Sequence, residues 1–367
     1  MDAASHLPFK GLKILELSSV LAGPLAGSFF AEGGAEVVKV EHPEYGDVTR
    51  SWRASGESSD SDISAYYASA NTNKTVARID LGSEEGKAWL EEQLASSDVL
   101  LQNFKEKDLA KFNLTPSSVA SRHPHLVHIR LVGFADTPER LAYDVVVQAE
   151  TGFMHMNGSP DGPPTRLPVA LMDVLASDQI RSAALSGLFA RERGTRGWYS
   201  EVSLERSGLT ALVNRGTNYL MNGTVPHRLG SAHPNIAPYG DILKVSDSLI
   251  VLAVGSDAQF QHLCAVLSLP SLTDSPSFSS NAARVENRDE LIPLLQEAAK
   301  SLNPEKFMEE LLLKGVPAGV IRSLDEVFRP GSDAAKTVIE EDVKGAGRAV
   351  RKTSTVAYRT TIFGKDT

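Results

Sequence analysis

The sequence has few of the features that would assign the chain to several broad classes of protein. It has a single cysteine, Cys264, so no disulfide can form within the chain and an oxidising compartment is not indicated. No segment approaches the roughly 18 to 20 apolar residues of a membrane-spanning helix. The N-terminus has no apolar core of the kind found in signal peptides. We therefore expect a soluble, cytoplasmic protein that does not engage a membrane.

A basic excess is also absent. Acidic residues outnumber basic ones by 46 to 37, which gives a formal net charge of −9. Non-specific binding to nucleic acid requires a positive surface, so nucleic acid is not expected as a partner. An anionic small molecule is still compatible with this charge, because a local group of lysines and arginines is enough to hold it.

Two further kinds of site have incomplete motifs. His123, His125 and His128 are close in sequence, but no cysteine or acid completes a ligand set around them, so no metal site is predicted. Gly23 and Gly27 follow the first predicted strand, yet they are four residues apart. A dinucleotide-binding turn needs two glycines only two positions apart, so a nicotinamide cofactor is disfavoured.

The first two hundred residues alternate between short apolar runs and helical stretches. Strands are predicted at residues 12–17, 37–40, 76–81, 98–101, 126–132 and 198–204. Strands separated by helices at this spacing are typical of βαβ units and of a mostly parallel sheet, so the fold class is α/β.

The length of 367 residues is enough for two domains. We expect a large Rossmann-like domain over residues 1–225. A smaller α+β domain is expected over 226–325, because its apolar segments at 242–245 and 249–253 are typical of a hairpin. Residues 326–367 are expected to form a return segment towards the large domain.

One carboxylate is unusual in its surroundings. Asp173 ends an apolar run, has no charged residue within four positions, and lies at the start of a helix predicted from about residue 178. An aspartate at such a place either caps a helix or takes part in chemistry. The two roles are compatible, because a helix N-terminus favours the ionised carboxylate.

A larger set of segments, taken in order over roughly residues 8 to 328, resembles the family III CoA-transferases. The segments are Gly11–Leu17, Leu21–Pro24, Gly34–Pro43, Gly46–Arg50, Asn73–Lys74, Asp98–Phe104, Pro124–Val127, Tyr143–Asp144, Pro160–Asp173, His233–Tyr239 and Gly315–Pro317.

The resemblance implies a reaction and a set of site residues. Asp173 would be the covalent nucleophile, through an aspartyl anhydride and an aspartyl-CoA thioester, while Tyr143 and Asp144 would line the acyl pocket. The substrates would be an acyl-CoA and a carboxylic acid, with coenzyme A as cosubstrate and no tightly bound cofactor. The implied assembly is an interlocked homodimer. The implied CoA-binding residues are Asn71, Thr72, Asn73, Lys74, Asn103, Phe104, Lys111 and Phe112. Lys74 is the best candidate cation for a phosphate, with Arg50 and Arg53 as further candidates.

Two alternatives to this transfer reaction follow from the same resemblance. In the related 2-methylacyl-CoA racemases a histidine precedes the residue matched by Asp144, whereas this chain has Tyr143 there, which favours transfer. His155 is close enough in sequence to be considered as a relocated base. The segment from Lys344 to Thr367 differs from the closing segment that is usual in the resembled family. This difference raises the alternative of a CoA-binding homologue without catalytic activity.

Overall fold

The structure is a computed structural model that describes residues 7–361, apart from residues 60, 342, 344–348 and 359. Parts of the predicted return segment, at 344–348 and 362–367, therefore lie outside the described residues. Contacts divide the chain into two compact units. The first comprises residues 1–153, 166–224 and 336–367, and the second comprises residues 154–165 and 225–335.

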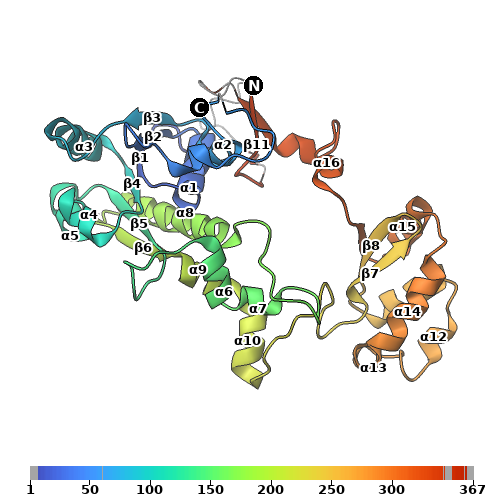
Figure 1. The fold of residues 1–367 in the computed structure, drawn as a ribbon. Coiled ribbons are helices and arrows are strands. Elements are labelled where there is room, and N and C mark those ends of the chain that lie inside the picture. Colours follow the sequence, from blue (N-terminus) through green and yellow to red (C-terminus); the bar gives the residue numbers. More distant parts are fainter. Residues whose placement is uncertain (1–6, 60, 342, 344–348, 359, 362–367) are drawn as a thin grey trace. The chain divides into compact units, whose positions relative to one another are not determined.

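The first unit is built on a six-stranded sheet in which each pair of neighbouring strands is parallel (Figure 1). The strand order is β3-β2-β1-β4-β5-β6, the doubly wound order of Rossmann folds. The strands are β1 (Lys13–Leu17), β2 (Glu36–Glu41), β3 (Thr75–Arg78), β4 (Val99–Gln102), β5 (Val127–Val132) and β6 (Tyr199–Ser203). The prediction of a mostly parallel α/β sheet is thus confirmed.

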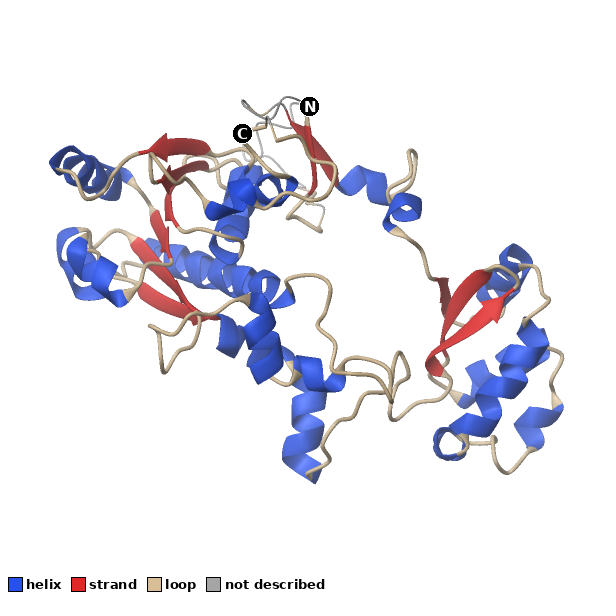
Figure 2. Ribbon diagram, in the orientation of Figure 1, coloured by secondary structure: helices blue, strands red, loops and turns tan. Residues whose placement is uncertain are grey.

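Helices cover both faces of this sheet (Figure 2). Successive residues of a strand point to opposite faces. Ile14 accordingly packs towards α1 (Ala22–Glu32) and α8 (Leu171–Glu192), while Leu15 packs towards the opposite layer. That opposite layer consists of α3 (Glu84–Ser96), α4 (Glu106–Lys111) and α5 (Pro116–Arg122).

The remaining elements of the first unit surround this core. They are η2 (Val48–Ser51), α2 (Ala65–Asn71), α6 (Asp144–Glu150), α9 (Leu204–Ala211), α10 (Val213–Asn222), β10 (Val338–Glu341) and β11 (Val350–Thr353). Two short helices, α7 (Phe153–Met156) and η3 (Ala334–Thr337), span the boundaries between the units. The Glu32 carboxylate, at the end of α1, accepts hydrogen bonds from Lys352, from the Ser354 hydroxyl and from Thr355. The segment that follows β11 is thereby attached to the first unit.

The second unit has a three-stranded antiparallel sheet, β7-β8-β9, with its own apolar core. Its elements are β7 (Tyr239–Val245), β8 (Ser248–Ala253), α11 (Asp257–Val266), α12 (Ser271–Asp274), α13 (Asn281–Glu286), α14 (Arg288–Ala299), α15 (Pro304–Leu313), β9 (Ala318–Val320) and α16 (Leu324–Val327). The predicted hairpin is confirmed as β7 and β8. Among the described residues, no helix is long and apolar enough to cross a membrane.

Candidate active site

A cleft of about 450 Å³ opens at the carboxyl ends of the central strands of the first unit. Its wall includes residues that follow β1, β2, β4 and β5, the edge at which doubly wound sheets bind ligands. The residues with functional groups that line it include Ser18, Ser19, Glu41, His42, Asp47, Asn103, Lys105, Asp108, Arg140 and Tyr143. The topology therefore places this cleft where a nucleotide-like ligand would bind.

Asp173 lies beside this cleft, in the first turn of α8. Its residue is only 9% exposed. Burial, with a smaller contribution from the nearby Asp144 carboxylate, raises the pKa of the Asp173 carboxyl to about 7, while the nearby backbone N–H of Ala22 opposes the rise. Ala22 and Asp144, which act on this carboxyl, lie within two residues of Val20 and Tyr143, which line the cleft.

The interpretation of Asp173 as a helix cap is wrong. Helix α8 begins at Leu171, earlier than the sequence predicted, and its cap residue Ala170 has no capping side chain. Asp144 takes that role from the start of α6, because its Oδ1 accepts the Met172 N–H at 2.8 Å. The carboxylate of Asp173 is therefore directed to α1, and the helix end that it adjoins does not keep its pKa low.

Asp144 is itself held in place by Gln148, one turn along α6. The Gln148 Nε2 donates to Asp144 Oδ2 at 2.6 Å, and Gln148 Oε1 accepts the Leu167 N–H at 2.8 Å. Asp144 and Gln148 together attach α6 to the segment that leads into α8. The structure thus brings Asp144 close to Asp173, which lies 29 residues later in the sequence.

Tyr66, in α2, is a member of this site that the sequence analysis missed. Burial, together with the Asp173, Asp144 and Asp47 carboxylates, raises the pKa of its phenol to about 12. The Trp52 ring packs edge-on against it with ring centroids 5.0 Å apart. At neutral pH Tyr66 is therefore a neutral hydroxyl near both carboxylates. No motif identifies Tyr66 in the sequence, where Tyr66 and Tyr67 are simply two aromatic residues close to the start of a helix.

Of the predicted CoA-binding residues, Asn103 and Phe104 line the cleft. The Asn103 side chain exchanges two hydrogen bonds with the backbone of Ser19, at 3.3 and 3.2 Å, and so links the end of β4 to the turn after β1. The Phe104 ring lies 5.4 Å from that of Phe112, and the Lys111 ammonium lies over the Phe112 ring. Lys111 and Phe112 are thus next to a cleft residue but do not line the cleft themselves.

Residues Asn71 to Lys74 lie behind α1 and do not line the cleft. The Lys74 ammonium is fully buried, where it donates to Glu16 Oε2 at 2.8 Å and to the Pro24 carbonyl at 2.7 Å. Asn71 and Thr72 are buried as well, and the Asn73 amide donates to Glu341. Binding of CoA by these four residues stays a prediction, and Lys74 has another function in the fold that is described below.

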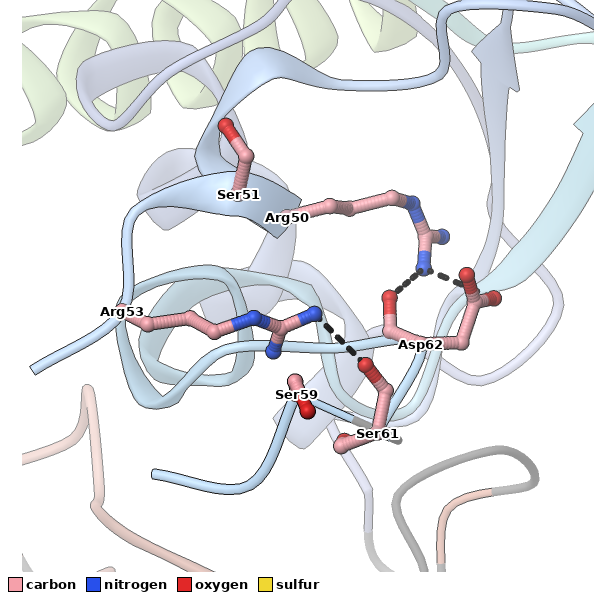
Figure 3. A pocket seen from close by; sticks show the side chains of 6 residues that line it. All are labelled: Arg50, Ser51, Arg53, Ser59, Ser61 and Asp62. Carbon is pink, nitrogen blue, oxygen red and sulfur yellow. Dashed lines mark hydrogen bonds and ion pairs between the residues drawn. The ribbon is translucent and has the colours of Figure 1, made fainter. Parts of the chain in front are cut away.

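Arg50 and Arg53 line a second, shallow hollow of about 400 Å³ (Figure 3). The Arg50 guanidinium binds Glu41 through two hydrogen bonds, at 2.8 and 3.0 Å, and also contacts Asp62. The Arg53 guanidinium donates to the Ser61 carbonyl at 2.7 Å and to the Ser58 carbonyl. These contacts stabilise the loop before α2. The Arg50 guanidinium is already paired with two carboxylates of the protein, Glu41 and Asp62.

The cationic and aromatic groups at the cleft come from other positions. Lys105 and Arg140 line it, and Arg140 also forms an ion pair with Glu150. His42, at the end of β2, stacks on Tyr45 with ring centroids 4.6 Å apart and an angle of 20°. His42 lines the same cleft as Lys105 and Arg140. An aromatic ring and cationic side chains in one cleft suit an adenine ring and its phosphates. The sequence showed these residue types without showing that they share one edge.

The histidines that are close in sequence have structural contacts. His128 is buried in β5, where its Nε2 lies 2.8 Å from Gln102 Nε2, and burial lowers its pKa to about 4. His123 contacts Glu91. Within the part of the chain that the structure describes, no group of three or more His, Cys, Asp or Glu is placed to hold a metal ion.

The chain is similar to known proteins over most of its length. The model of CoA-transferase family III matches residues 9–361. Succinate–glutarate CoA-transferase of Agrobacterium fabrum is 36% identical over 327 residues, which cover 88% of this chain and 82% of that protein. Human succinyl-CoA:glutarate CoA-transferase is 33% identical, with 89% and 74% covered. The crystal structure of a CaiB/BaiF family protein from Brucella suis aligns with a TM-score of 0.81 and 34% identity, over 96% of this chain and 93% of that one.

Proposed function

This chain belongs to CoA-transferase family III and is a CoA-transferase, and from that premise we propose that its reaction proceeds through covalent intermediates on Asp173. The observation that carries the proposal is the placement of Asp173, buried beside the cleft between the Ala22 N–H and Asp144. A buried carboxylate is poorly hydrated when ionised, which makes it a better nucleophile than one in water.

The proposed sequence has four transfers. An oxygen of the Asp173 carboxylate attacks the thioester carbonyl, the C–S bond breaks, and CoA thiolate leaves behind an aspartyl anhydride. The thiolate then attacks the aspartyl carbonyl, which releases the donor acid and gives an aspartyl-CoA thioester. The acceptor carboxylate attacks this thioester and releases the thiolate again. The thiolate finally attacks the acyl carbonyl of the second anhydride, which forms the product thioester and regenerates Asp173.

The residues around Asp173 have distinct proposed roles. The Ala22 N–H stabilises negative charge on the Asp173 oxygens. Tyr66 supplies a neutral hydroxyl donor close to the reacting carboxyl. Asp144 holds the start of α8 through Met172 and, with Tyr143, borders the acyl group. Exclusion of water is needed at every step, because each anhydride or thioester intermediate is otherwise hydrolysed.

Coenzyme A would occupy the cleft at the carboxyl ends of the strands. We place its adenine against His42 and Tyr45 and its phosphates near Lys105 and Asn103. The remaining residues that the resemblance implied, Asn71 to Lys74 with Lys111 and Phe112, stay candidates for this binding. Charge-assisted contacts of this kind are strong for phosphate even on a protein of net negative charge.

We propose short dicarboxylic acids as the exchanging acids. The relatives from Agrobacterium fabrum and human are named for succinate and glutarate, which have four and five carbons. We also propose the homodimer that the family resemblance implies. Helix α10 supports it, because it leaves apolar side chains such as Leu220 and Met221 exposed in the single chain.

The nucleophile is tested by Asp173→Asn. We expect the exchange of CoA between succinyl-CoA and glutarate to fall by about 10⁴-fold, as for the loss of other covalent nucleophiles. The matched control is Asp178→Asn on the same helix, whose carboxylate is largely exposed and pairs with Arg181. It should retain the activity of the unchanged protein.

Mass spectrometry of protein quenched during turnover should locate the CoA thioester on the peptide that contains Asp173. Near-normal exchange by Asp173→Asn would refute the assignment of the nucleophile. Incorporation of solvent deuterium into a 2-methylacyl-CoA without any acceptor acid would instead indicate racemase chemistry.

A further inference from the structure

Four buried charged side chains form a continuous chain of ion pairs beneath the turn that joins β1 to α1. Asp47 contacts the Lys39 ammonium at 3.0 Å, Lys39 contacts Glu16 at 3.2 Å, and Glu16 contacts the Lys74 ammonium at 2.8 Å. All four side chains have zero exposed area. Two anions and two cations leave no net charge, so the group is electrically balanced where solvent cannot screen it. We call these four residues the buried quartet.

The two ammonium groups of the buried quartet also bind the main chain. Lys39 donates to the Ser18 carbonyl at 2.8 Å, and Lys74 donates to the Pro24 carbonyl at 2.7 Å. Ser18 follows β1 and Pro24 lies in the first turn of α1. The buried quartet therefore holds both ends of the connection between these two elements.

Close packing of α1 also restricts the conformation of this connection. A Cβ atom at Gly23 would lie 2.3 Å from the Ser18 hydroxyl oxygen, and one at Gly27 would lie 1.9 Å from Glu16 Oε2 and 3.1 Å from the Lys74 ammonium. Helix α1 thus packs directly on the buried quartet. Val20, inside the connection, has a φ of 74°, a left-handed conformation that a β-branched residue adopts only where the surroundings impose it.

The same connection contributes to the active site. Ser18, Ser19 and Val20 line the cleft. Two residues later, the backbone N–H of Ala22 is close enough to the Asp173 carboxyl to lower its pKa, and Ala22 lies in the same buried apolar cluster as Met172, the residue before Asp173. Pro24, which Lys74 holds, is two residues beyond Ala22. A displacement of the first turn of α1 would therefore alter the contact between Ala22 and the reacting carboxyl.

We propose that Glu16 and Lys74 are positioning residues of the transferase, which hold the first turn of α1 so that the Ala22 N–H stays against Asp173. The inference rests on the proposed role of Asp173 as nucleophile. It assigns the buried Lys74 ammonium to the main chain of α1, and not to a phosphate of CoA.

The test separates positioning from general stability with three variants of the full-length protein. Lys74→Met leaves Glu16 with one cation fewer and should lower the melting temperature. The double variant Glu16→Gln with Lys74→Met removes one charge of each sign, so most of that loss should be recovered. Neither the single nor the double variant can bind the Pro24 carbonyl through an ammonium.

The decisive readout is the acid limb of kcat/KM against pH. Without the Ala22 N–H in place, the ionised form of Asp173 is less favoured, so the limb should move to higher pH in both variants, by roughly half a pH unit or more. The charged and titratable groups that face Asp173, Asp144 from α6 and Tyr66 from α2, are unchanged. In the double variant the two deleted charges compensate each other at long range, so loss of a distant cation cannot cause the shift.

Glu16→Asp provides a third variant that keeps all four charges. Its shorter side chain draws Lys74 away from Pro24, and we expect a smaller shift of the limb in the same direction. A double variant with recovered stability and an unchanged pH profile would overturn the proposal. If the double variant does not fold, an unchanged profile in Glu16→Asp has the same consequence. Failure of the proposed function is recognised separately, by an active Asp173→Asn.

Discussion

Asp173 illustrates how the immediate surroundings of one residue set its chemistry. The sequence suggested that a helix end would keep its carboxylate ionised. Burial and the Asp144 carboxylate instead raise its pKa to about 7, and the single Ala22 N–H only reduces the rise. At neutral pH the protonated and ionised forms are thus both populated. The free energy needed to ionise this buried group is a cost that the fold carries at the site of reaction.

This cost predicts a pH-dependent effect of Asp173→Asn on stability. Because the pKa of Asp173 is higher in the folded than in the unfolded chain, its contribution to stability is complete below pH 4 and is lost as the pH rises towards 7. The loss is ~4 kcal/mol at most. The asparagine variant does not ionise, so it should be more stable than the unchanged protein at pH 8, and this difference should be much smaller at pH 4.5. Urea denaturation at the two pH values measures this. A destabilised variant at pH 8, or an advantage that is the same at both pH values, would contradict it.

At the scale of elements, the start of α8 depends on a side chain from another helix. The sequence offered Asp173 itself as the cap, whereas the residue at the cap position is Ala170, whose side chain cannot accept a hydrogen bond. Asp144 supplies the missing acceptor from α6. Other helices have their cap in the adjacent sequence. Ser83 accepts the Gly86 N–H at the start of α3, and Thr115 accepts the Ser118 N–H at the start of α5.

Two substitutions at Asp144 separate its capping role from its charge. Asp144→Ala removes the acceptor of the Met172 N–H and should lower the free energy of unfolding by about 1 kcal/mol, as for the loss of other caps. Asp144→Asn keeps an acceptor oxygen and should cost less. Both variants remove the negative charge beside Asp173, so the acid limb of kcat/KM should move to lower pH. Denaturation curves and pH profiles of the two variants measure these effects. A limb that moves upwards or stays in place would show that Asp144 does not act on Asp173 through its charge.

At the scale of the whole molecule, α10 is difficult to explain in an isolated chain. Leu220 and Met221 are 82% and 77% exposed, and Val213 and Tyr219 are exposed too. The chain from Leu204 to Asn222 forms two helices, α9 and α10, and not one continuous helix. Such an exposed apolar surface on a short helix is typical of an interface with another chain.

The proposed homodimer gives α10 a testable role. Leu220→Asp combined with Met221→Asp places two charges on its apolar side, and we expect the dimer to dissociate into monomers at micromolar concentration. Size-exclusion chromatography with light scattering measures the mass. Asn214→Asp, an exposed position on the same helix, is the matched control and should stay dimeric. An undiminished dimer in the double variant would exclude α10 from the interface.

Features that depend on neighbours along the chain could be predicted from the sequence alone. The alternation of apolar runs gave the six parallel strands, the hairpin of β7 and β8 followed from two apolar segments around a turn, and the ordered motifs gave the family. These signals lie within a few residues of one another, so periodicity and composition reveal them.

The surroundings of Asp173 result from the packing of elements that are distant in sequence, so they became visible only in the folded chain. Lys74 is 58 residues from Glu16 and 50 from Pro24, and Asp144 is 28 residues from Met172. Whether a lysine reaches solvent or pairs beneath a helix depends on how separate elements pack, and packing is not encoded in any local pattern. The same holds for the pKa of Asp173, since burial and one approaching carboxylate, both products of the assembled fold, set its value.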